Sequence, residues 1–177
     1  MLNRMFTPFP ILKTERLTLR QVGMNDEQEI VALRSDREVN KYLGRQPSNT
    51  IDEVRNFINQ INENSLKNDS IYWAITVSNH PDLIGAIGLF GFSEKQGNCE
   101  IGYELLPAYQ GQGIMQEAVR AVIDYAFATI NVQAIEATLH PTNQRSIKLL
   151  EKFSFRASNQ TGSTDSDILG YQLNKSN

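Results

Sequence analysis

The chain has 177 residues, of which 40% are hydrophobic and 21% charged, and its formal net charge is −3. These values are typical of a globular domain of ordinary size, and the lack of any run of Lys or Arg argues against nucleic acid as a partner. One cysteine excludes an intrachain disulfide, and two histidines are too few for a Cys/His metal site. No apolar run reaches membrane-spanning length and the first ten residues do not resemble a signal peptide, so we expect a cytoplasmic protein without a membrane segment.

The first 70 residues predict one strand and two helices. Residues 1–13 are expected to form a loose lead-in. Alternating apolar residues predict a half-buried strand over 16–22. Polar capping residues followed by apolar residues at helical spacing predict helices over about 25–34 and 50–65.

The middle of the chain predicts an antiparallel meander. Its three strands, over 71–77, 83–92 and 99–106, are separated by turn-forming Asn, Pro and Gly residues. In the third strand, alternation places two sets of side chains on opposite faces, Cys99, Ile101, Tyr103 and Leu105 on one and Glu100, Gly102 and Glu104 on the other.

The last third returns to alternating helices and strands. We expect an apolar helix over about 115–129, a buried strand over 134–139, a short helix from about 143 to 153, and closing strands over 155–157 and 168–173. The polar hairpin 158–167 between the closing strands is expected to be mobile. Because no repeat or linker interrupts the chain, we predict one α/β domain over 1–177 with an ordered core of about 12–173.

The loop before the helix at 115 is the first candidate for a ligand site. Gly111 and Gly113 lack a Cβ, so their backbone can approach a ligand closely. The helix that follows directs unpaired N–H groups and a partial positive charge into the loop, which favours a phosphate or pyrophosphate. A turn in which glycine only relieves strain explains the same residues equally well. The sequence lacks the Gly-Lys-Ser/Thr of the P-loop, and Gln116 stands where the dinucleotide fingerprint has its third glycine.

The run Gln110-Gly111-Gln112-Gly113-Ile114-Met115 resembles the acetyl-CoA loop of the GNAT N-acetyltransferases, Arg/Gln-x-x-Gly-x-Gly/Ala. Further segments resemble the RimJ/RimL branch, which acetylates ribosomal-protein N-termini: residues 14–20, 100–107, 117–118, 143–146 and 151–152. The resemblance covers about 12–173. It implies an α/β (α+β) fold with a mixed, mostly antiparallel central sheet, flanked by helices and splayed at the cofactor site.

This resemblance implies an acetyl-CoA-dependent N-acetyltransferase in which a primary amine attacks the thioester directly. The amine is a protein N-terminus, of ribosomal-protein type, or a small molecule, and relatives suggest a homodimer. The acetyl-CoA contacts implied are Leu105, Leu106, Gln110, Gly111, Gln112, Gly113, Ile114, Met115, Asn143 and Ser146, with coenzyme A as the product and no metal.

Three positions depart from the family pattern. Met115 replaces a small residue, Leu150 stands where many relatives have a tyrosine that acts as acid toward the leaving thiolate, and Ser154 replaces a glycine, which predicts local strain. The first two departures motivate an alternative, a non-catalytic module that binds acetyl-CoA as a sensor or supports a partner.

Acetyl transfer also needs a proton acceptor, because an ammonium group cannot attack a thioester. Glu100 is the first candidate for this catalytic role, since it lies on the strand that leads to the cofactor and beside Gly102. A solvated position on an open sheet face is an equally weighted interpretation of Glu100. Glu104 is the second candidate, and for it we favour the solvated position. Glu117 is interpreted as structural, paired with Arg120 one helical turn later.

Overall fold

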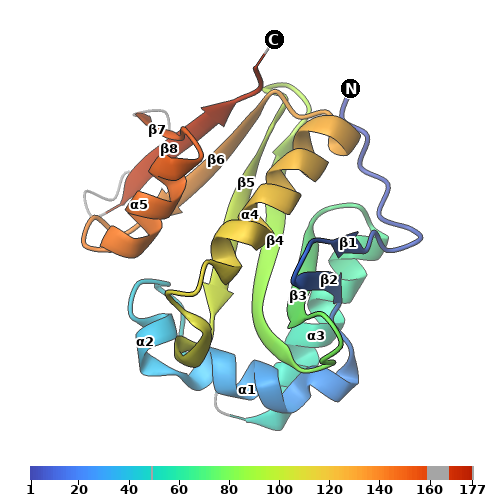
Figure 1. The fold of residues 1–177 in the computed structure, drawn as a ribbon. Coiled ribbons are helices and arrows are strands. Elements are labelled where there is room, and N and C mark those ends of the chain that lie inside the picture. The colour runs from blue at the N-terminus through green and yellow to red at the C-terminus, as the bar shows by residue number, and fades with distance from the viewer. Residues whose placement is uncertain (49, 159–167, 177) are drawn as a thin grey trace.

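The computed structural model describes residues 1–48, 50–158 and 168–176. Within them one sheet has the strand order β1-β2-β3-β4-β5-β6-β8-β7. Neighbouring strands are antiparallel except for β5 and β6, which are parallel. Figure 1 shows helices flanking this sheet, which confirms the predicted mixed, mostly antiparallel architecture.

The elements follow the predicted order closely. The strands are β1 (Leu12–Lys13), β2 (Leu17–Gln21), β3 (Ile71–Val77), β4 (Leu83–Ser93), β5 (Asn98–Leu105), β6 (Ala134–Leu139), β7 (Arg156–Ser158) and β8 (Leu169–Asn174). The α-helices are α1 (Glu27–Ser35), α2 (Arg37–Asn40), α3 (Ile51–Leu66), α4 (Ile114–Tyr125) and α5 (Gln144–Lys152). The predicted helix over 115–129 is α4 continued by a wider π-helical turn, Ala126–Ile130.

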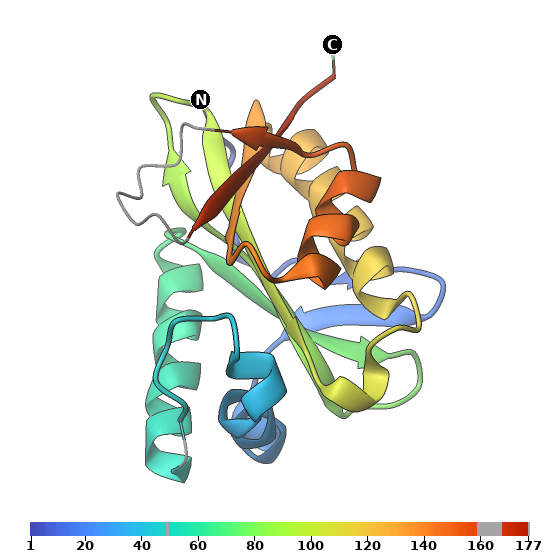
Figure 2. The same cartoon turned by 90° about the vertical axis from the view of Figure 1, so that its left-hand side faces the viewer.

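Two hydrophobic clusters fix which face of the sheet each helix covers. The cluster with α4 contains Ala118, Val119 and Val122 together with Cys99, Ile101 and Leu105 of β5. The cluster with α1 and α3 contains Ile30, Leu33, Val54 and Ile58 together with Ala74 and Ala86. Figure 2 shows α3 and α4 on opposite sides of the sheet. The alternate residues of β5, which include Glu100 and Glu104, therefore belong to the face of α1 and α3, as the predicted alternation requires.

The sheet opens between β5 and β6. These strands are paired only where residues 98–100 lie beside residues 134–136. Beyond that point β5 continues to Leu105 and stays paired with β4, whereas β6 continues to Leu139 and stays paired with β8. The predicted splay is therefore present, and it lies at the end of β5 that leads to the glycine loop.

The expectation of a loose lead-in is wrong. Leu2 and Phe6 are 8% and 2% exposed and belong to the α4-side core. The Trp73 Nε1–H donates to the Pro10 carbonyl at 2.7 Å. Apolar residues scattered among prolines carry no periodic pattern, so only the tertiary fold reveals that they cover the sheet. The ordered core therefore begins before residue 12.

Other local expectations have mixed outcomes. Ser154 has a φ of +65°, so the position where the family has glycine requires the strained left-handed backbone. The predicted mobile hairpin lies, apart from Ser158 in β7, outside the described residues. In the described part of the chain, no helix has the length and apolar character needed to cross a membrane.

Candidate active site

The glycine loop leaves a row of backbone donors without partners. Gly111 and Gly113 have φ values of +76° and +77°, and Gly113 is the N-cap of α4. Within residues 1–48, 50–158 and 168–176, no acceptor takes a hydrogen bond from the N–H groups of residues 111–116. A Cβ at Gly111 would meet no atom within 4 Å. The loop is therefore an open set of donors at the positive end of a helix dipole, which is the arrangement that binds phosphate.

Glu117 secures an arginine beside this loop. Its Oε1 accepts hydrogen bonds from Thr14 Oγ1 at 2.5 Å and from the Arg16 N–H at 2.8 Å, and its Oε2 lies 2.6 Å from Arg16 Nε. Arg16 Nη1 also donates to the Gln112 carbonyl at 3.1 Å. Desolvation raises the pKa of Glu117, but the hydrogen bonds from Thr14 and Arg16 outweigh it and lower the pKa below its ordinary value.

The predicted partner of Glu117 was wrong, while the structural role fits its contacts. Glu117 pairs with Arg16, 101 residues away, and the guanidinium of Arg120 instead lies 4.7 Å from the centre of the Phe153 ring. The i, i+3 spacing allows a Glu–Arg pair, but the fold offers Arg120 an aromatic face.

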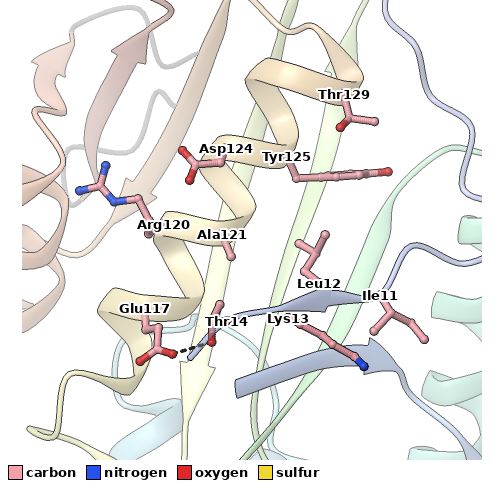
Figure 3. Close-up of a pocket in the computed structure, with 10 residues that line it drawn as sticks. All are labelled: Ile11, Leu12, Lys13, Thr14, Glu117, Arg120, Ala121, Asp124, Tyr125 and Thr129. Atoms are coloured by element: carbon pink, nitrogen blue, oxygen red, sulfur yellow. Dashed lines mark hydrogen bonds between the residues drawn. The ribbon is translucent and has the colours of Figure 1, made fainter. Parts of the chain in front are cut away.

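Two hollows border α4. A cavity of about 320 Å³ adjoins the loop and is lined by Arg16, Gly113, Gln116, Glu117, Arg120 and Phe153. Its two guanidinium groups suit a phosphate-bearing ligand. A larger groove of about 550 Å³ lies between α4 and β1 (Figure 3) and contains none of the residues predicted to bind acetyl-CoA. In Figure 3 the Glu117 carboxylate points toward Thr14, and Glu117 lines both the groove and the cavity beside the loop.

The end of β5 is joined to the loop and to α5 through Gln110. The Gln110 Nε2–H donates to the Leu105 carbonyl at 2.9 Å, and Arg145 of α5 donates to Gln110 Oε1. Asn143 caps α5 by accepting a hydrogen bond from the Ser146 N–H at 3.2 Å. The structure thus places the predicted loop residues at the β5 side of the splay and Asn143 and Ser146 at the β6 side. The contact between Arg145 and Gln110 joins the two sides.

Tyr103 is a further candidate site residue, which the sequence did not single out. It lies on β5 beyond the last pairing with β6, and its ring packs against the α4-side core. Burial raises the pKa of Tyr103 to about 12, opposed by a hydrogen bond from Ser146 of α5. The phenol is therefore protonated at neutral pH and can donate a hydrogen bond inside the splay. Leu150, where many relatives have tyrosine, is fully buried in the core.

The two candidate carboxylates of β5 have different surroundings. Glu100 is half-buried, its Oε1 accepts from Thr138 Oγ1 at 2.7 Å, and no described residue donates to its Oε2. Glu104 is 9% exposed, accepts from the Tyr72 hydroxyl at 2.7 Å and lies 2.6 Å from Arg45 Nη2. The expectation of a solvated Glu104 is therefore wrong, because the segment after α2 folds over β5 and brings a guanidinium group to it.

Comparison with known proteins identifies the family. The model of the acetyltransferase (GNAT) domain matches residues 16–156. An uncharacterized N-acetyltransferase, p20 of Bacillus licheniformis, is 38% identical over 145 residues, which is 82% of each chain.

Two solved structures have the same fold. RimL, a ribosomal L7/L12 alpha-N-protein acetyltransferase in complex with coenzyme A, superposes with a TM-score of 0.80 at 16% identity, over 93% of this chain and 98% of that one. Spermidine N-acetyltransferase from Vibrio cholerae, in complex with coenzyme A and spermine, has a TM-score of 0.77 at 20% identity, over 91% and 96%. The chain therefore belongs to the GNAT family and is an N-acetyltransferase whose acetyl donor is acetyl-CoA.

Proposed function

We propose that this N-acetyltransferase acetylates a protein N-terminal amine, and that Glu100 accepts the proton which the attacking amine must lose. One observation carries the proposal. The section of β5 that is not paired with β6 has Glu100, whose Oε2 accepts from no described residue, at one end, and leads at its other end to the glycine loop, whose N–H groups have no described acceptor. Bound acetyl-CoA supplies the activated acetyl thioester.

The donor side of the proposal rests on the loop and the strand end. The N–H groups of residues 111–116 and the Arg16 guanidinium hold the pyrophosphate, since both are positive and border the same cavity. The unpaired edge of β5 up to Leu105 and Leu106 holds the amide-rich arm as an added strand would be held. Asn143 and Ser146 line the opposite side of the splay.

The acceptor side rests on the opposite face of β5. Glu100 is separated from the α4-side core by strand alternation, so an amine can reach it from the α1 and α3 face. Its Oε2 has no donor among the described residues, whereas both oxygens of Glu104 are engaged. Glu100 is therefore the carboxylate that can take a proton, directly or through water.

A protein N-terminus is favoured over a polyamine by the segments that resemble the RimJ/RimL branch, and the RimL structure has the same fold. A polyamine is the second candidate, because the spermidine N-acetyltransferase structure also shares the fold. The two candidate acceptors differ in the pKa of the amine. A free N-terminus has a reference pKa of about 8, against about 10.4 for an alkyl ammonium, so a larger fraction of N-termini is in the reactive, uncharged form at neutral pH.

Calorimetric titration with acetyl-CoA, followed by turnover assays on peptides with free N-termini and on polyamines, tests the proposal. We expect binding of acetyl-CoA but not of ATP or NAD, and turnover on peptides. Turnover on polyamines alone would overturn the acceptor, and binding without any turnover would favour the sensor module.

A further inference from the structure

Residues 41–45, between α2 and α3, span the open end of the splay. On one side Arg45 Nη2 lies 2.6 Å from Glu104 Oε2, near the end of β5. On the other side the Tyr42 ring lies 5.9 Å, centre to centre, from the ring of His140, which directly follows β6. Because β5 and β6 are parallel, the carboxyl ends of the two strands lie at the same edge of the sheet. We call residues 41–45 the bridge segment.

The contact with β5 is the firmer of the two. The side chains of Arg45 and Glu104 are 23% and 6% exposed. Glu104 also accepts from the Tyr72 hydroxyl at 2.7 Å, and Arg45 Nε donates to Asn40 Oδ1 at 2.7 Å. Removing one member of a buried ion pair leaves the other charge uncompensated, so this pair strongly constrains the position of the bridge segment.

The bridge segment lies on the acceptor side of β5. Glu104 shares its face of the strand with Glu100 and with α1 and α3, whereas Leu105, the next residue, packs on the α4 side. An amine that approaches Glu100 from this face therefore approaches on the side of β5 that the bridge segment contacts at Glu104. Within the described residues, the hydrogen bond, ion pair and ring contacts of Arg45 and Tyr42 involve none of the residues proposed to bind acetyl-CoA.

We propose that Glu104 is a positioning residue which, through Arg45, fixes the bridge segment as a wall of the acceptor-binding site. This inference rests on the proposed function and deepens it. The pair governs acceptor affinity and leaves acetyl-CoA affinity unchanged, and the Tyr42–His140 contact supports the far end of the same wall.

The test compares Glu104→Gln, Arg45→Gln and Arg45→Lys. Glu104→Gln keeps a hydrogen-bond acceptor for Tyr72 and removes only the charge, and Arg45→Lys keeps the charge. We expect both Gln variants to raise the acceptor KM about tenfold or more, with the acetyl-CoA Kd within about twofold, and Arg45→Lys to recover most of the loss. Amide hydrogen exchange at residues 41–48 should quicken in the Gln variants only.

Arg55→Gln is the matched control, since it removes an ion pair of 2.7 Å between the exposed Arg55 of α3 and Glu27 of α1, and should change neither KM nor exchange. An unchanged acceptor KM in folded Glu104→Gln, or equal losses of acceptor and acetyl-CoA affinity, would overturn the inference. If the wild type shows neither binding nor turnover, the proposed function fails, while the exchange measurement still decides whether Glu104 fixes the bridge segment.

Discussion

The loop at the start of α4 and the cluster around Glu104 hold their polar groups in opposite ways. In the loop, the donors are backbone N–H groups, residues 111–113 are exposed, and no described residue accepts a hydrogen bond from these groups. In the cluster, the polar groups belong to side chains from three distant segments, Glu104 is buried and Arg45 and Tyr72 are partly buried, and these groups contact one another. The loop is thus ready to receive a ligand without rearrangement, whereas the cluster maintains the shape of the wall around it.

Substitution at Gly113 should produce the largest effect, because it fills the open loop. Gly113→Trp is expected to weaken acetyl-CoA binding by at least about a hundredfold, since the bulk occupies the phosphate site. Calorimetry measures the affinity and circular dichroism the fold. Gly113→Ala is the control: at a φ of +77° it adds strain of about 1–2 kcal/mol without the bulk, and should weaken binding less. Unchanged affinity in a folded Gly113→Trp protein would contradict the loop assignment.

Glu100→Gln tests whether the Glu100 carboxylate accepts the proton of the attacking amine. We expect kcat/KM to fall about a hundredfold to a thousandfold with little change in acetyl-CoA Kd, because Gln cannot accept the proton. Glu136→Gln is the matched control: Glu136 is the register partner of Glu100 on β6, and its Oε1 is already bonded to Asn98 at 2.6 Å. Equal losses in both variants would mean that the face needs negative charge rather than a base at Glu100.

Tyr103→Phe tests the phenol that lies on β5 beyond its pairing with β6. If this phenol donates a hydrogen bond to the leaving thiolate, kcat should fall about tenfold while acetyl-CoA Kd stays within about twofold. Steady-state kinetics with calorimetry measure both. Tyr125→Phe removes a phenol on α4, outside the site, and should have no effect. A Tyr103→Phe enzyme with wild-type kcat would exclude this role.

Glu117→Gln should have the smallest effect, on stability. The pKa of Glu117 is lowered in the folded state, so its ionised form stabilises the fold above its unfolded pKa, and this contribution disappears as pH falls through the folded pKa. We expect the variant to lose about 1–2 kcal/mol at pH 7, a Tm decrease of roughly 2–8 °C, and the difference to vanish as pH falls through the folded pKa of Glu117. A Tm difference independent of pH would show that packing, not charge, is responsible.

Local patterns were sufficient for most elements and for the donor side of the site. The capping box at Thr50 and Glu53 begins α3 one residue later, as predicted, and the strand boundaries of 71–77 and 134–139 match β3 and β6. Gly113 is the N-cap of α4 in a left-handed conformation, which glycine adopts without strain. These features depend on neighbours in the sequence, so the sequence specifies them.

Contacts between distant residues had to come from the tertiary structure. Nothing near Glu104 indicates that Arg45 reaches it, and nothing near Glu117 indicates Arg16. The ionic partner of a carboxylate is decided by which segments the fold brings together and by the cost of burying it alone. The sequence by itself therefore determined the elements, the loop and the family resemblance, whereas only the tertiary structure decided which β5 carboxylate is open, which is locked, and what forms the wall beside them.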